Sequence, residues 1–197
     1  MNAIESYGQR TAKGEVTFTR LLPGPMERVW RFLTDSEKRG LWLASGPMVS
    51  STGGKVDLHF RHGELSEEKT PPPSYSHLAE GTHLTGTVTH CKPPGLLGFT
   101  WEAGNTRSEV IFRLSTFDRR VRLLLTHRRL SSPEAERNVA GGWHLHLDLL
   151  LAKLEGDSPP PYWTGLVKLK GEYARLFTEE EASPRAGVRL RNGGRDF

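Results

Sequence analysis

The alternation of apolar and polar positions predicts a series of half-buried strands. Near the N-terminus, Val16 and Phe18 alternate with threonines, the period-two pattern of a strand with one buried face. Five similar sets follow along the chain: Val56, Leu58 and Phe60; Leu84, Gly86 and Val88; Leu97, Phe99 and Trp101; Val110, Phe112 and Leu114; Val121, Leu123 and Leu125. Together they predict at least six strands, spaced as an antiparallel meander.

Two short helical segments are predicted between the first and second of these strands. Pro25 can occupy the first turn of a helix over about residues 25–34, because a proline there loses no helical hydrogen bond. This helix would place four apolar residues on one side: Met26, Val29, Trp30 and Leu33. A new capping sequence at 34–36 then predicts a second short helix or turn, which ends at Gly46 and Pro47.

After the last strand the apolar period changes from two to about 3.6. The stripe consists of Val139, Trp143, Leu147, Leu150 and Leu154, widened by Leu145 and Leu149. It predicts a long, deeply buried helix over residues 133–156. A proline-rich break follows at 158–161, and a final helix is expected around residues 163–177. Residues 63–81, rich in proline and glutamate, are expected to form a long mobile loop.

The order of these elements predicts an α+β fold. A curved antiparallel sheet should wrap around one long C-terminal helix, with two short helices inserted after the first strand. We expect a single domain over residues 1–183 and a basic disordered tail over residues 184–197.

Composition and charge narrow the classes of protein. With 197 residues and 36% hydrophobic side chains, the chain can build a core. The net charge is +4, but residues 184–197 contain four arginines against one aspartate, so most of the excess lies in the tail. Nucleic-acid binding requires basic side chains clustered on the folded part, and we therefore expect no nucleic-acid partner.

The expected cellular location follows from two kinds of segment that the sequence lacks. The apolar runs are far shorter than the roughly 18 residues of a membrane-spanning helix, and residues 1–14 lack the apolar stretch of a secretory signal. Cys91 is the single cysteine, which excludes an internal disulfide. We expect a cytoplasmic protein without a membrane partner.

Several short motifs, in a fixed order, resemble a known superfamily. They are Pro25-Met26-Glu27-Arg28-Val29-Trp30, Leu33-Thr34-Asp35-Ser36-Glu37, Leu41-Trp42-Leu43, Gly86-Thr87-Val88-Thr89 with Pro93-Pro94, Phe99-Thr100-Trp101-Glu102, Leu124-Leu125-Thr126-His127 and Gly142-Trp143-His144-Leu145-His146-Leu147-Asp148. Over about residues 15–177 this set resembles the START-like (SRPBCC) superfamily, in the branch named for the C-terminal domain of the activator of the heat-shock-chaperone ATPase. The resemblance implies a helix-grip fold with a cavity between sheet and long helix, commonly used for apolar or amphipathic small molecules.

The resemblance implies no shared catalytic constellation, because members range from lipid carriers to cyclases. Binding of a small hydrophobic or amphipathic molecule in the cavity is therefore our functional prediction. One alternative is a stress-response module that contacts a chaperone through the outer sheet, and a homodimer is a further partner to consider. Another is a cyclase- or hydrolase-type enzyme that uses His127 with an unidentified carboxylate. The namesake co-chaperone has a separate N-terminal domain without a counterpart in this sequence, and we expect no chaperone activation.

The predicted cavity wall combines inward-facing residues of the strands and helices. It consists of Trp30, Phe60, Phe99, Trp101, Phe112, Leu123, Leu125, His127, Trp143, Leu147 and Leu150. His127 continues the inward face of its strand, where it could orient a ligand or act as an acid or base. The alternative for His127 is a histidine whose hydrogen bonds are satisfied by a backbone partner. Trp101 is expected to point inward and Glu102 to solvent.

Other candidate chemistry is not supported by residue spacing. His144 and His146, two residues apart on a helix, project about 200° apart, so they cannot share a metal, and we expect one exposed and one partly buried. His59 and His62 also lie on opposite faces and lack a completing carboxylate. Catalytic serine, phosphate-loop and dinucleotide motifs are absent from the sequence, and Cys91 has no suitably placed base. We expect no metal, no cofactor and no catalytic cysteine.

Overall fold

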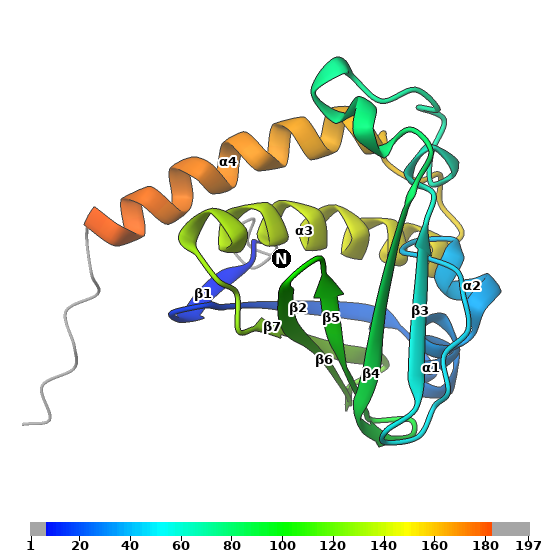
Figure 1. The fold of residues 1–197 in the computed structure, drawn as a ribbon. Helices are drawn as coiled ribbons and strands as arrows, with labels where there is room; N and C mark the ends of the chain where they lie inside the picture. The colour runs from blue at the N-terminus through cyan, green and yellow to red at the C-terminus, as the bar shows by residue number, and fades with distance from the viewer. Residues whose placement is uncertain (1–6, 183–197) are drawn as a thin grey trace, which may run out of the picture.

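The fold is built on a single curved β-sheet (Figure 1). The computed structural model describes residues 7–182. All seven strands pair antiparallel in the order β1-β2-β7-β6-β5-β4-β3. Their bounds are β1 Gln9–Ala12, β2 Glu15–Pro23, β3 Lys55–Phe60, β4 Thr82–Lys92, β5 Leu96–Ala103, β6 Thr106–Phe117 and β7 Arg120–Arg128. The predicted α+β class, the curved sheet and all six predicted strands are confirmed.

The additional strand, β1, was not predicted because its sequence has no alternation of apolar and polar residues. Its sequence is Gln-Arg-Thr-Ala, and its side chains are mostly exposed. It lies at the sheet edge, where it pairs with β2 from Gln9 opposite Thr17 to Ala12 opposite Glu15. A strand with neither face in the core leaves no hydrophobic period to detect.

Two short helices, α1 (Met26–Thr34) and α2 (Ser36–Gly40), connect β2 to β3 as predicted. The side chain of Asp35 caps α2 by accepting a hydrogen bond from the Lys38 amide. Within α1, Val29 and Leu33 are buried, but Trp30 is only half-buried. The insert therefore packs on the core with Val29 and Leu33 fully buried, whereas Trp30 packs against it only in part.

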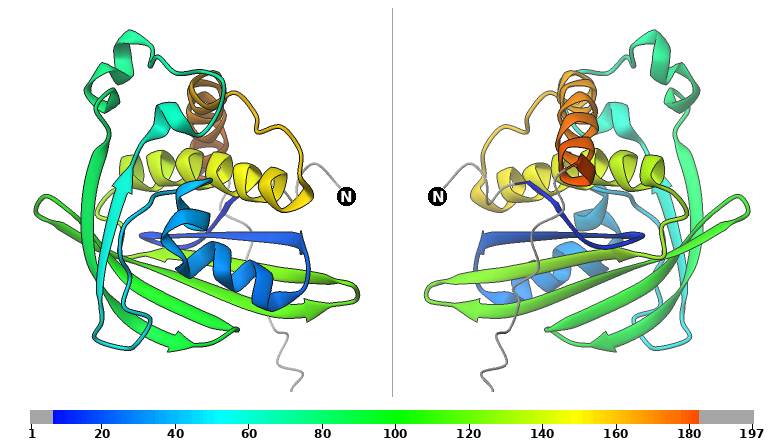
Figure 2. Two further views of the ribbon diagram at one scale, coloured as in Figure 1. Left: turned by 90° about the vertical axis from the view of Figure 1, so that its right-hand side faces the viewer. Right: turned by 90° about the vertical axis from the view of Figure 1, so that its left-hand side faces the viewer.

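The long helix α3 (Pro133–Glu155) lies across the concave face of the sheet, and α4 (Tyr162–Ala182) covers α3 on its other side (Figures 1 and 2). Both helices confirm the prediction. Because α3 is sandwiched between two layers, it is buried almost all round from Ala140 to Leu150. This corrects the expectation for His144 and His146, which are both buried, each about 6% exposed.

The segment 63–81 is held in place by contacts with α4. It contains two short 3-10 helices, η2 (His62–Glu64) and η3 (Pro73–Leu78). The first amides of a helix need external acceptors; here Tyr162 N donates to Ser66 Oγ at 3.0 Å and Thr164 N donates to Glu68 Oε2 at 2.9 Å. The bond from the Thr164 hydroxyl lowers the pKa of Glu68. The segment expected to be a long mobile loop thus contacts the first turn of a helix 96 residues further along the chain through Ser66 and Glu68.

Two further expectations concern the ends of the chain and the membrane. The basic tail, residues 184–197, lies outside the described residues. Within residues 7–182, none of the helices has the length and apolar character needed to cross a membrane.

Candidate ligand-binding pocket

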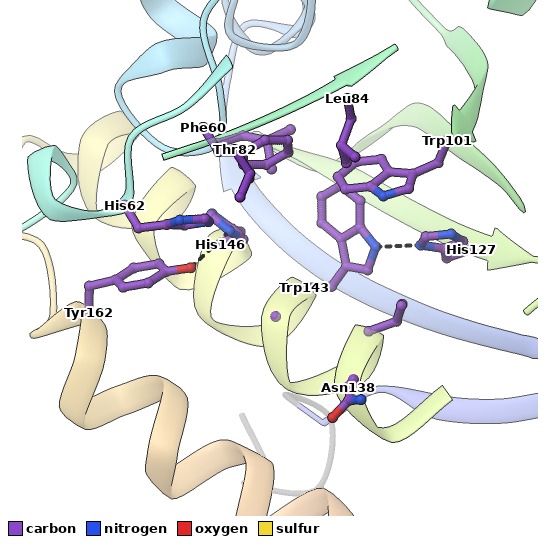
Figure 3. Close-up of a pocket in the computed structure, with 13 residues that line it drawn as sticks. Phe60, His62, Thr82, Leu84, Trp101, His127, Asn138, Trp143, His146 and Tyr162 are labelled. Carbon is purple, nitrogen blue, oxygen red and sulfur yellow. Dashed lines mark hydrogen bonds between the residues drawn. The ribbon is translucent and has the colours of Figure 1, made fainter. Parts of the chain in front are cut away.

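A pocket of about 280 Å³ lies between α3, the strands β3 to β5 and the start of α4. Its wall is made of Leu43, Phe60, His62, Thr82, Leu84, Trp101, His127, Asn138, Val139, Gly142, Trp143, His146 and Tyr162 (Figure 3). Asn138 is exposed, whereas Thr82 and Leu84 are half-buried. The pocket therefore meets solvent between β4 and the first half of α3.

Aromatic rings make the main apolar wall. The Trp101 ring lies 5.4 Å from the Trp143 ring at 63° and 5.6 Å from the Phe60 ring. Such edge-to-face and tilted contacts are favourable arrangements of aromatic quadrupoles. Three rigid side chains from β3, β5 and α3 thus form a surface that suits a planar apolar molecule.

His127 positions this wall. The indole Nε1–H of Trp143 donates to His127 Nδ1 at 2.9 Å (Figure 3). On the other side of the ring, Ser108 Oγ lies 2.7 Å from His127 Nε2. Because an indole nitrogen only donates, Nδ1 must be the unprotonated nitrogen, and Nε2–H donates to Ser108. Burial lowers the pKa of His127 to about 3, so the ring is neutral at physiological pH.

These bonds correct the suggested role of His127. Both of its nitrogens are engaged within the protein, which leaves neither a lone pair nor a proton for a ligand. The alternative of a satisfied histidine is the one that the contacts favour, although its partners are the side chains of Trp143 and Ser108 rather than backbone groups.

Three polar side chains gather at the end of the pocket that lies away from Asn138. They are His62, His146 and Tyr162 (Figure 3). His146 Nδ1 is 2.7 Å from the carbonyl oxygen of Trp42, and the Tyr162 hydroxyl is 3.4 Å from His146 Nε2. We refer to His62, His146 and Tyr162 as the polar end.

His62 is the least satisfied member of the polar end. It is 8% exposed, and within the described part of the chain its Nδ1 has no hydrogen-bond partner. Its ring stacks on Phe60 at 5.6 Å and lies 5.1 Å from the Tyr162 ring. Burial lowers the pKa of His62 to about 4 and that of His146 to about 3. Both imidazoles are therefore neutral at pH 7.

The structure brings together four of the eleven side chains predicted for the cavity wall: Phe60, Trp101, His127 and Trp143. The other seven do not line this pocket. Trp30 is half-buried on α1, and six lie in the packed core outside this pocket: Phe99, Phe112, Leu123, Leu125, Leu147 and Leu150. Core and cavity walls use the same residue types, so an inward-facing period could not separate them.

The sequence reasoning missed the polar end and most of the rim. Leu84 and Val139 belonged to predicted apolar faces, so a signal for them existed. His62 and Tyr162 lie beside irregular segments, where no periodicity tells which way a side chain points. His146 carried a signal, since it lies within the long buried helix, but the sequence analysis expected one of His144 and His146 exposed and the other only partly buried.

Neither a metal site nor a cysteine close to the pocket is found in the described part of the chain. Among the residues that the structure describes, no cluster of three His, Cys, Asp or Glu side chains could hold a metal ion. Cys91 Sγ donates to the carbonyl oxygen of Ser50 at 3.1 Å on β4, away from the pocket.

Comparisons with known proteins agree with this architecture. The family described as Activator of Hsp90 ATPase homolog 1-like protein matches residues 23–155. A Bordetella parapertussis protein with an NMR structure is 43% identical, with a TM-score of 0.74 over 86% of this chain and 89% of its own. CalU16 from Micromonospora echinospora is 22% identical, with a TM-score of 0.63 over 86% and 94% of the two chains, and shows the shared fold. Among curated proteins, no sequence matches this chain.

Proposed function

The chain belongs to the Activator of Hsp90 ATPase homolog 1-like family, within the START-like superfamily, and from this premise we propose that its pocket binds a small planar hydrophobic molecule. The family suggests a fold for hydrophobic ligands. The observation that carries the proposal is the pocket itself: aromatic rings of Phe60, Trp101 and Trp143 form one wall, and the three side chains of the polar end gather at one end of the pocket. Natural small-molecule sites combine an apolar wall with a few polar groups in this way.

The volume indicates the size of the ligand. A dry apolar cavity of about 150 Å³ takes up benzene, and small-molecule pockets begin at roughly 300 Å³. A pocket of about 280 Å³ therefore suits a molecule of about two fused rings. Burial of its apolar surface contributes roughly 25 cal/mol per Å² before the costs of association, which makes micromolar affinity reasonable.

The other two functional hypotheses draw less support from the site. A catalytic pair of His127 and a carboxylate would need a free imidazole nitrogen, yet both are engaged. Within the described residues, no Asp or Glu lines the pocket. Chaperone interaction rests on the family description alone, whereas small-molecule binding has a physical site.

Filling the pocket tests the proposed function. A Cβ atom added at Gly142 meets no atom within 4 Å, and Gly142 lines the pocket. In Gly142→Leu the new side chain should occupy the ligand space, and the Kd for 2-naphthol should rise at least about tenfold, the loss of roughly 1.4 kcal/mol of contact. Tryptophan fluorescence and calorimetric titration measure this, since Trp101 and Trp143 lie in the wall.

Gly171→Leu is the matched control. Gly171 also lies within a helix and also offers open space to a Cβ atom, but it is exposed on α4, outside the pocket. Both substitutions remove a helix glycine, so both should raise helix stability by a similar amount. Equal affinity of the wild type and Gly142→Leu would contradict ligand binding in this pocket.

A further inference from the structure

We infer that the polar end selects a hydroxyl group, so that the ligand is a hydroxylated aromatic compound rather than a plain hydrocarbon, a carboxylate or an amine. This inference rests on the proposed ligand-binding function. It follows from which hydrogen-bonding roles remain open at His62, His146 and Tyr162 in the pocket wall.

The tautomer of His146 is determined by its backbone partner. The Trp42 carbonyl oxygen, 2.7 Å from Nδ1, can only accept. Nδ1 must therefore carry the proton, and Nε2 presents a lone pair. Only the Tyr162 hydroxyl reaches this lone pair within the described residues, and 3.4 Å is long for an O–H donor. His146 Nε2 is thus an acceptor in need of a better donor.

His62 adds a second unsatisfied group at the same place. Its ring is more than nine-tenths buried, lines the pocket and has no hydrogen-bond partner at Nδ1. A neutral imidazole offers one N–H and one lone pair. Leaving such a buried group unpaired costs free energy, which a polar ligand atom would recover.

A hydroxyl group matches these open roles. It can donate its proton to His146 Nε2 and accept one from Tyr162 O–H or from a His62 N–H. The three rings come from η2, α3 and the start of α4, so they approach the same region from different sides (Figure 3).

Other polar groups match less well. An ionised carboxylate only accepts, so it would face the His146 lone pair, and no Lys or Arg side chain lines the pocket among the described residues. An ether or ketone oxygen also only accepts hydrogen bonds, so it would likewise face the His146 lone pair without a proton to donate. An ammonium group would be buried without a carboxylate to pair with. The group that fits the polar end is therefore a neutral one that both donates and accepts a hydrogen bond.

Naphthalene and three of its derivatives separate the possibilities. We expect 2-naphthol to bind the wild type about tenfold more tightly than 2-methoxynaphthalene or naphthalene, the factor for one buried hydrogen bond. 2-Naphthoate should bind more weakly than 2-naphthol. Calorimetric titration at pH 7 measures all four affinities.

Two variants test whether His146 and Tyr162 cause the preference for a hydroxyl group. In His146→Asn the amide nitrogen can still donate to the Trp42 carbonyl, but the acceptor at the Nε2 position is lost, and the hydroxyl preference should fall to about twofold or less. Tyr162→Phe removes only a hydroxyl and keeps the ring stacking, so it provides an independent readout. The hydroxyl preference of this variant should fall about threefold.

The outcomes distinguish this inference from the proposed function. Equal binding of 2-naphthol, its methyl ether and naphthalene would overturn the hydroxyl preference but leave ligand binding intact. A full preference retained in both variants would place the hydroxyl elsewhere and also overturn the inference. Failure of every probe to bind the wild type would instead remove the proposed function.

Discussion

Replacing Arg39 with methionine should lower the free energy of unfolding by about 4 kcal/mol, because one buried and two partly buried carbonyl groups lose a charged donor. Arg39 is 1% exposed in α2. Its Nε donates to Ala44 O and one terminal nitrogen donates to Thr34 O, both at 3.0 Å, and the other terminal nitrogen donates to Gly46 O. Burial lowers the pKa of Arg39 to about 10, so it remains charged at neutral pH.

Urea unfolding of matched variants checks this result. Arg39→Lys should lose about half as much stability, since one ammonium cannot reach three diverging carbonyls as a planar guanidinium does. Arg31→Met on the exposed side of α1 is the control and should stay within about 0.5 kcal/mol of the wild type. A loss below about 1 kcal/mol in Arg39→Met would contradict the proposed importance of these bonds.

The effect should extend to the pocket. Arg39 joins the end of α1 to residues 44–46, and Trp42 lies in the short segment between Arg39 and Ala44. The carbonyl of Trp42 sets the tautomer of His146. Loosening this segment should therefore weaken binding of 2-naphthol more than binding of naphthalene.

Acidification from pH 7 to pH 5 should destabilise the protein by roughly 2 kcal/mol for each histidine buried in its neutral form. Burial lowers the pKa of four imidazoles to about 3 or 4: His62, His127, His144 and His146. In the unfolded chain they bind protons near pH 6.5. The unfolded state therefore takes up more protons as the pH falls, and stability is lost from about pH 6.5 down to the pKa values of the folded state.

The summed loss is comparable with the whole stability of a domain, about 5–15 kcal/mol, so we expect acid unfolding at about pH 4 to 5. Asp148 acts in the opposite direction, because burial raises its pKa and the folded state then takes up a proton. Unfolding by urea at several pH values between 7 and 5 measures the slope.

His62→Phe tests the origin of the slope. Phenylalanine keeps the stacking on Phe60 while removing a buried nitrogen without a partner, so stability at pH 7 should be unchanged or higher. The loss of stability per pH unit should decrease by about 1 kcal/mol. His77→Phe in the exposed part of η3 controls for the substitution, and an unchanged slope in His62→Phe would contradict the prediction.

The amino-acid sequence by itself determined the fold class, the order of the elements and the buried helix α3. These properties are local: a period of two in β2 or β7, and of 3.6 in α3, records which face of an element is in the core. Val16, Phe18, Leu123 and Leu147 are all buried as that reasoning requires. β1 escaped because an edge strand with exposed side chains leaves no such record.

The tertiary structure alone decided where the core stops and the pocket begins. Phe99 and Trp101 share a face of β5, yet only Trp101 lines the pocket, because that difference depends on what packs opposite each ring. The polar end unites His62, His146 and Tyr162 with the Trp42 carbonyl, from four separate segments. Whether an imidazole nitrogen is satisfied depends on neighbours distant in sequence, so no periodicity along the chain can reveal it.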